Sequence, residues 1–531
     1  MAVADPPTPA PRDWKGQDTL RKALLQILAV ALLLAGAVYL VVQRGERRKE
    51  IADRLKEAHL LALRDNPRDL QRASEELAAI FAIDKDARDA LALAADIETE
   101  RWLFHRVQGS EQKSREYLRR AEAEDSRSED RFGSKILQLI AEGKPEDAER
   151  YAEDLRRQGA SSAKIWYGIA LAHEVQGHAA LSREAFVQAT DKAWKNPRYF
   201  AAYGEALLDQ GDYRQAVEVL SRALAANPDH LRAKLALALA QIQRQERVKD
   251  AADAIKEALA QRDQLSPGLL ARTLAAQAEL ANFERRYGEA TGLAQQALQH
   301  NSQERFALLA RARALALTKD PGALEAFRAA AGASRFAPAP YLVGAPLLQQ
   351  AGKLDSALAL LDDYAQVYSK VEVPDSEGRA HPALERDDQY WIVRGDVLRA
   401  AGKRDEAMQC YERAIATDGV NRTRAYFAKG ALLLDTRSYD AALEALARVT
   451  PEDGSGSIPE AYQAKGEALF AKGQFAQGCQ SYALALTRLH AQQAPRERLN
   501  AIVAGVSRQL SANGQAQMAK LWEREAAPLI R

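Results

Sequence analysis

The chain has 531 residues, enough for several domains or one long repeat array, and its 74 lysines and arginines balance 73 aspartates and glutamates to a net charge of +1. This balance gives no global reason to expect nucleic acid or an acidic substrate as a partner. Two cysteines, Cys410 and Cys479, are too few for a disulfide framework, and the apolar share of 47%, mostly alanine and leucine, favours packed helices over sheets.

The first feature along the chain is an apolar run of 20 residues, Ala23 to Val42, broken only by Gln26. As a helix it spans about 30 Å, the thickness of the hydrocarbon core of a bilayer. Basic residues flank the run on both sides: Arg21, Lys22, Arg44, Arg47, Arg48 and Lys49. We therefore predict a transmembrane helix over residues 23–42, after a proline-rich, disordered cytoplasmic tail over residues 1–22.

A cleaved signal peptide is the competing interpretation, because Ala35-Gly36-Ala37 fits a small-x-small cleavage site. Against it, the apolar run continues through Val42, and a long region precedes the run.

The orientation of the predicted helix in the membrane has two interpretations. Lysine and arginine counts lean towards a cytoplasmic body, whereas the short basic tail resists export, and long domains cross largely regardless of charge. We favour a single-pass protein of a bacterial inner membrane with its body in the periplasm; a cytoplasmic body is the alternative.

Three stretches of the remaining chain share one internal spacing of large and small residues. Each has a large, a small and a large residue, then a glycine, then a small, a large and a small residue. The three sets are Phe200, Gly204, Leu207, Gly211, Ala216, Leu220 and Ala223; Trp391, Gly395, Leu398, Gly402, Ala407, Tyr411 and Ala414; and Tyr462, Gly466, Leu469, Gly473, Gly478, Tyr482 and Ala485. Small residues let two antiparallel helices approach closely, and the middle glycine ends the first helix by taking a left-handed backbone at low cost. The spacing therefore predicts helical hairpins.

This pattern resembles the tetratricopeptide repeat, a helix–turn–helix unit of about 34 residues. The first small residue of the second helix recurs at Ala73, Ser114, Ala148, Ser182, Ala216, Ala251, Ala290, Ala323, Ala357, Ala407, Ala442, Gly478 and Ala519. The resemblance covers roughly residues 55–530 and implies an all-α solenoid of about 13 hairpins. Gly478 replaces the usual alanine, which we expect to loosen its helix by about 1 kcal/mol.

The longest step between these positions, from Ala357 to Ala407, divides the predicted solenoid. Residues 43–368 form a first sub-array, and residues 389–531 form a second. Between them, residues 369–388 form a loop insertion that contains Pro374, Gly378 and Pro382. Met518 and Trp522, four residues apart, suit a final helix that caps the last layer of the core.

In the tetratricopeptide family, first helices line a concave wall that grips segments of partner proteins. Some members clamp a terminal carboxylate with asparagine there, but the corresponding positions here hold no asparagine and include four carboxylates: Glu205, Glu279, Asp396 and Glu467. One interpretation is an acidic groove for a basic or amphipathic partner segment, with Phe427 and Phe470 as apolar anchors. The other is a solvated face neutralised by Arg198, Arg399 and Arg424, with both phenylalanines packed at helix elbows.

The sequence contains no nucleophile, phosphate-loop or metal-binding motif, so we expect no enzyme, cofactor or metal. We expect an anchored scaffold that binds unidentified proteins and organises an envelope complex, such as surface-appendage, polysaccharide-export or motility machinery. A periplasmic chaperone or assembly factor is the alternative. A regulatory subunit or arm of an envelope enzyme would need a non-repeat domain of about 100 residues, and a sheet beyond residue 50 would be its sign. We expect no contact with nucleic acid.

Overall fold

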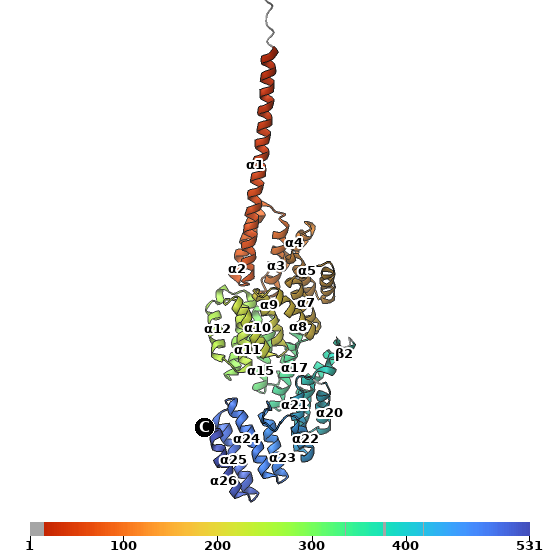
Figure 1. The fold of residues 1–531 in the computed structure, drawn as a ribbon, viewed down its shortest axis with the longest axis vertical. Helices are drawn as coiled ribbons and strands as arrows, with labels where there is room; N and C mark the ends of the chain where they lie inside the picture. Colours follow the sequence, from red (N-terminus) through yellow and green to blue (C-terminus); the bar gives the residue numbers. More distant parts are fainter. Residues whose placement is uncertain (1–14, 335, 375–378, 418, 531) are drawn as a thin grey trace, which may run out of the picture.

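A long helix joined to a body of stacked helical hairpins makes up the structure (Figure 1). The computed structural model describes residues 15–334, 336–374, 379–417 and 419–530, so the predicted tail lies outside the described residues as far as residue 14. The described residues form 26 α-helices, three short 3-10 helices and one small sheet. Among them, one helix is long and apolar enough to cross a membrane: α1 (Lys15–Leu63), through its segment from Arg21 onward.

The helices pack as consecutive antiparallel pairs, and the end of α1 serves as the first member of the first pair. The first eight pairs are α1 with α2 (Pro67–Ile83), α3 (Arg88–Leu103) with α4 (Ser110–Ala123), α5 (Glu129–Ala141) with α6 (Pro145–Arg157), α7 (Ala163–Gln176) with α8 (Ala179–Lys192), α9 (Pro197–Asp209) with α10 (Tyr213–Ala226), α11 (Leu231–Arg244) with α12 (Val248–Ala260), α13 (Pro267–Phe283) with α14 (Tyr287–His300), and α15 (Arg305–Leu317) with α16 (Ala323–Ala333). The remaining five are α17 (Ala339–Gln350) with α18 (Leu354–Tyr368), α19 (Asp388–Ala400) with α20 (Arg404–Ala416), α21 (Arg422–Asp435) with α22 (Tyr439–Ala447), α23 (Pro459–Ala471) with α24 (Phe475–Ala491), and α25 (Arg496–Ala512) with α26 (Ala516–Ala526).

The predicted all-α solenoid of 13 hairpins is confirmed. All 13 recurring small residues, from Ala73 to Ala519, lie in the second helix of a pair, and all are buried. Their burial follows from the spacing, because only a small side chain fits where two helix axes approach closely. The hairpins therefore stack through one repeated kind of contact.

Two glycine roles predicted from the spacing are also confirmed. The turn glycines Gly211, Gly402 and Gly473 have φ values of 77°, 76° and 75°, the left-handed region that ends a helix. In the first helix of one pair, a Cβ on Gly395 would lie 2.5 Å from the Tyr411 ring of the second helix. The small residue of the first helix therefore makes room for the large residue of the second.

The predicted loop insertion contains a sheet, which we did not expect beyond residue 50. Strands β1 (Glu372–Pro374) and β2 (Ala380–Pro382) pair antiparallel, and a 3-10 helix, η2 (Ala383–Arg386), leads into α19. The hairpin projects from the side of the body (Figure 1). Each strand has only three residues, so the β-hairpin is far too small to form a core of its own. It is therefore not the non-repeat domain of about 100 residues that an enzyme would require.

The N-terminal half is not the open trough that a row of first helices predicts. Every residue of α3 from Ala90 to Glu100 is buried, although a helix in an outer layer needs only one buried face. The backbone N–H of Gly268, at the start of α13, donates to the carbonyl of His105, just after α3, at 2.9 Å. The first helices of the N-terminal half therefore close around α3.

Helix α26 packs against the last core layer of the described residues. Trp522 of α26 is buried, and its indole N–H donates to the carbonyl of Val503 in α25 at 3.1 Å. Met518, one turn earlier, packs against the same apolar cluster. The last helix therefore covers a core layer that no further repeat covers among the described residues.

Candidate functional site

Two carboxylates expected on an open inner wall are buried instead. Glu205 receives bonds from both Nε and Nη2 of Arg232, at 2.9 and 2.8 Å, and from Arg272 at 2.6 Å. Glu279 pairs with Arg313 at 3.2 Å. The acidic-groove interpretation is therefore wrong at these positions, because a carboxylate taken out of water needs its countercharge within the protein.

The other two carboxylates lie in the C-terminal half. Asp396 of α19 is half-buried; it accepts a hydrogen bond from Tyr411 at 2.8 Å and lies 3.8 Å from Arg424. Burial raises the pKa of Asp396, since it outweighs these stabilising contacts. Glu467 of α23 is exposed, and it makes no ion pair with any residue that the structure describes. Of the four carboxylates expected on the inner wall, Glu467 is therefore the one that is exposed.

The three arginines expected to neutralise the wall behave differently from one another. Arg424 lies beside Asp396, as expected. Arg399 bonds to Asp435 at 2.5 Å, on the neighbouring first helix α21. Arg198 is buried and does not pair with Glu205; it is part of a charged cluster at the base of α1 that the sequence analysis missed.

The two phenylalanines serve the core. Phe470 is buried and meets the rings of Phe475 and Tyr482 edge-on, at 5.5 Å between centroids in each case. Phe427 is half-buried and packs against the apolar cluster around Leu446. The elbow-packing interpretation therefore describes Phe470 better than an exposed anchor does.

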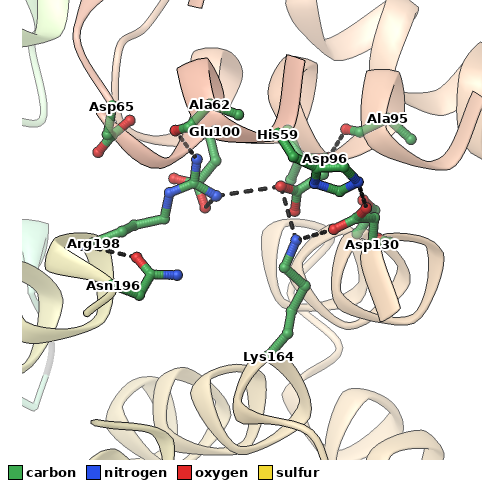
Figure 2. Close-up of polar contacts among 12 residues, drawn as sticks. His59, Ala62, Asp65, Ala95, Asp96, Glu100, Asp130, Lys164, Asn196 and Arg198 are labelled. Carbon is green, nitrogen blue, oxygen red and sulfur yellow. Dashed lines mark hydrogen bonds and ion pairs between the residues drawn. The ribbon is translucent and has the colours of Figure 1, made fainter. Parts of the chain in front are cut away.

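Arg198 belongs to a cluster of charged residues near the end of α1, which we call the base cluster (Figure 2). Its other members are His59, Asp96, Glu100, Asp130 and Lys164. From the start of α9, Nη1 of Arg198 lies 3.2 Å from Asp96 and 3.3 Å from Glu100, both on α3. Its Nη2 donates to the carbonyl of Ala62, in the last turn of α1, at 3.0 Å. One guanidinium therefore ties three helices together that are far apart in the sequence.

Lys164 extends the base cluster to two more helices. From α7, its ammonium lies 2.9 Å from Asp96 and 2.5 Å from Asp130 of α5, and His59 of α1 lies 3.4 Å from Asp130 (Figure 2). Burial alone would lower the pKa of Lys164, but the two carboxylates raise it, so the ammonium stays charged. The end of α1 is therefore fixed to the body by paired charges as well as by apolar packing.

Asp65, in the turn after α1, forms a second buried link. Its carboxylate lies 3.0 Å from Nε2 of His105 and 3.4 Å from Nε2 of His230, and His105 Nδ1 lies 2.9 Å from the hydroxyl of Ser266. Burial raises the pKa of Asp65, but the two histidines outweigh it and hold the pKa well below its usual range. These contacts join the turn after α1 to the segments that begin α11 and α13.

The order Ser266–His105–Asp65 resembles that of a hydrolytic triad, but the setting does not suit catalysis. All three side chains are buried, and neither His105 nor Ser266 lines the two cavities that flank this link. A nucleophile must reach a substrate within about 3 Å. We therefore assign this chain of hydrogen bonds to structure.

Glu100 is a carboxylate of the base cluster with a raised pKa. Burial raises its pKa to about 7, with Asp65 and Asp96 adding to the shift and Arg198 opposing it. Glu174 on α7 and Asp209 on α9 shift in the same direction, to pKa values of about 7 and about 6, mainly through burial. The interior of the N-terminal half therefore contains carboxyl groups that titrate near neutral pH.

Comparison with known protein families finds one match. The tetratricopeptide repeat family matches three stretches, residues 136–197, 202–267 and 392–457. These three stretches, which together make up less than half of the chain, match the tetratricopeptide repeat, whose family consists of typically non-catalytic scaffolds. No curated protein matches the sequence.

Several solved structures align with the chain at low sequence identity. The human IFIT1 dimer with PPP-AAAA has a TM-score of 0.43 and 15% identity, over 76% of this chain and 94% of its own. The APC/C hetero-tetramer Cut9–Hcn1 has a TM-score of 0.35 and 13% identity, over 92% and 97%. A tetratricopeptide repeat protein from Parabacteroides merdae has a TM-score of 0.29 and 15% identity, over 58% and 100%.

Proposed function

We propose that this protein is a single-pass membrane scaffold that holds a protein-binding solenoid at a set distance from a bilayer. The observation that carries the proposal is the division of α1. The large apolar side chains between Leu24 and Val42 are 52–75% exposed, whereas Ala58, Leu61 and Ala62 of the same helix are at most 4% exposed. Lipid would cover the first group, as the body covers the second.

The middle of α1 suits a short, rigid spacer. From Val42 to Ala58 the helix rises about 24 Å at about 1.5 Å per residue. Arg44, Arg47, Arg48 and Lys49 are exposed in this part, where they would meet lipid headgroups. Arg54 pairs with Glu50 at 3.1 Å and with Glu76 of α2 at 2.9 Å, which ties the lower end of the spacer to the body.

The base cluster and Asp65 would make the anchor and the body one rigid unit. A helix attached through a flexible linker would let the body swing. Here Arg198 of α9 donates to Ala62 in the last turn of α1, and His59 of α1 lies 3.4 Å from Asp130 of α5. Restricting a binding surface to a layer above the membrane raises its effective concentration towards other membrane components. This is a physical advantage of an anchored scaffold over a soluble one.

The C-terminal half is our proposed partner-binding region. In the N-terminal half, every residue of the first helix α3 from Ala90 to Glu100 is buried, whereas in the C-terminal half Glu467 of α23 is exposed and Asp396 of α19 is half-buried. We propose that these first helices hold a basic or amphipathic segment of a partner protein. Our proposed setting is a multi-protein complex of a bacterial envelope, such as appendage, polysaccharide-export or motility machinery, with the body in the periplasm.

Crosslinking in cells, followed by mass spectrometry, tests the proposed function. We expect the region from α19 through α23 to form crosslinks with a partner that co-purifies at a fixed ratio. Glu467→Lys should reduce the yield of these crosslinks at least about threefold through charge reversal. Glu444→Lys, at an exposed position of the second helix α22, is the matched control and should leave the yield unchanged. Many weak clients without a fixed ratio would overturn the scaffold in favour of a chaperone.

A further inference from the structure

Three arginines follow the apolar segment of α1 on one side of the helix: Arg44, Arg47 and Arg48. Each lies seven residues, close to two helical turns, before a residue that contacts the body. Two of these contact residues, Ile51 and Leu55, pack against the apolar cluster that α1 forms with α2 and α3. The third is Arg54, which bonds to Glu76 of α2 at 2.9 Å. The three arginines therefore lie on the side of α1 that faces the body.

A different side of the same stretch, turned away from the body, is acidic. Its carboxylates recur at spacings of four, three and four residues, so they form one stripe along the helix: Glu46, Glu50, Asp53 and Glu57. All four are exposed, and Glu50 alone forms an ion pair with a described residue, Arg54, at 3.1 Å. Lys49 also lies away from the arginines, two turns before Lys56, which is exposed.

The arginines lie where lipid headgroups would meet the helix. They follow Val42, the end of the exposed apolar segment, by about 3–9 Å at about 1.5 Å per residue. Their side chains are exposed, and none of them forms an ion pair with a described residue. The guanidinium groups are therefore available to a partner outside the chain.

The body reaches nearly the same level. Helix α2 runs antiparallel to α1, and the bond between Arg54 and Glu76 fixes their relative height. From Glu76 to Ile83, the last residue of α2, the chain advances about 10 Å towards the bilayer, the same rise as from Arg54 back to Arg47. The end of α2 is therefore level with Arg47.

The turn after α2 does not offset the charge of the arginines. Arg120 lies 3.6 Å and Lys85 lies 3.8 Å from Asp86, and Arg88 lies 3.9 Å from Asp89. With Asp84, three carboxylates there face three cationic groups. The net positive charge at this level therefore comes from α1.

We propose that Arg44, Arg47 and Arg48 bind the phosphate groups of anionic phospholipids on the side of α1 where the body lies; this inference rests on the proposed membrane anchor. Guanidinium groups donate in a planar fork that fits phosphate oxygens, and basic residues next to a bilayer attract lipids of net negative charge. The acidic stripe repels the same lipids from the other side of the helix. Anionic lipids therefore gather next to the end of α2.

Energy transfer from the body to labelled lipids tests the proposal. The full chain carries a donor dye at Ala82→Cys, an exposed position near the end of α2, with Cys410→Ala and Cys479→Ala to remove the native thiols. It is reconstituted in vesicles of phosphatidylcholine and phosphatidylglycerol, with a trace of one of the two lipids labelled on its acyl chain. We expect transfer to the anionic phosphatidylglycerol to exceed transfer to phosphatidylcholine at least about 1.5-fold, and the excess should shrink at high salt.

Two sets of variants separate the arginines from general charge. The triple variant Arg44→Gln, Arg47→Gln and Arg48→Gln should bring the ratio of the two transfers to about 1, whereas lysine at all three positions should keep most of the excess. Arg48→Gln and Lys49→Gln are a matched pair, since both positions are exposed, adjacent and lose one charge. Arg48→Gln should remove about one third of the excess, and Lys49→Gln less than half as much.

Equal losses from Arg48→Gln and Lys49→Gln, or an excess that survives the glutamine triple variant, would overturn the proposal. Flotation of the vesicles distinguishes this failure from a failure of the anchor. A chain that floats with the vesicles but transfers equally to both lipids overturns this inference alone. A chain that floats with vesicles of neither composition overturns the proposed anchor as well.

Discussion

The guanidinium of Arg198 lies 3.2 Å from the carboxylate of Asp96, although 102 residues separate the two in the chain. The pair joins α9 to α3. The same guanidinium lies 3.3 Å from the Glu100 carboxylate and donates a hydrogen bond to the Ala62 carbonyl at the end of α1. This contact shows that the N-terminal half closes on itself. The long helix α1 is therefore bonded to helices several repeats away, as well as to its nearest neighbour.

Arg198→Met should destabilise the N-terminal half by about 3–5 kcal/mol, because it leaves Glu100 buried without its nearest countercharge and leaves Asp96 with Lys164 alone. Urea unfolding followed by circular dichroism measures the loss. Arg424→Met removes the exposed partner of Asp396 and should cost less than about 1 kcal/mol. Equal effects of the two substitutions would show that Arg198 is not a central contact of the closed half.

Glu100→Gln should flatten part of the pH dependence of stability. Because the folded pKa of Glu100 is raised to about 7 from an ordinary 4.5, the native state binds more protons than the unfolded state between these values. The free energy of unfolding should therefore fall as the pH rises from about 5 to about 8, and Glu100 should contribute about 1–3 kcal/mol of that fall.

The measurement is the difference between the two pH profiles of unfolding. Glu444→Gln, at an exposed position, should leave the profile of the unchanged protein intact. If Glu100→Gln keeps the full decline between about pH 5 and about pH 8, the charge of Glu100 is not the source of it.

Gly402→Val should lower the free energy of unfolding by about 2 kcal/mol, because a β-branched residue resists the left-handed backbone. Gly402 has φ 76°, and no atom lies within 4 Å of the place where its Cβ would stand, so the effect comes from the backbone alone. Gly505→Ala, inside α25 with open space around it, should be neutral or stabilising. If the Gly402→Val variant melts like the unchanged protein, the assigned turn is wrong.

Gly478→Ala separates helix propensity from packing. Propensity alone predicts a gain of about 1 kcal/mol, since alanine forms helices better than glycine. In the structure, a Cβ there would lie 2.2 Å from the Phe470 ring, so we expect a net loss of about 1–3 kcal/mol. Adding Phe470→Leu should restore part of the loss in thermal unfolding, whereas a more stable single variant would contradict the packing explanation.

The repeat pattern predicted the hairpins because each one depends on residues close together in the sequence. The turn at Gly402 and the contact of Gly395 with Tyr411 are local and recur along the chain. The closure around α3 was not predicted, because it depends on pairs such as Asp96 with Arg198. A usable signal was present: residues 90–97 of α3 are apolar except for Asp96, which leaves little of a polar face.

The wrong expectation for Glu205 has the same cause. From the sequence alone, a carboxylate that faces water at a predicted wall position cannot be distinguished from one that faces Arg232. Only the three-dimensional structure shows that arginines from α11 and α13 meet at this carboxylate.

The membrane anchor is tested most directly by the intact mass and location of the full chain expressed in a bacterial host. Our account predicts an uncleaved chain that stays in the membrane fraction after an alkaline wash, whereas a chain lacking residues 1–42 is released. A soluble product whose mass corresponds to cleavage after Ala37 would contradict it.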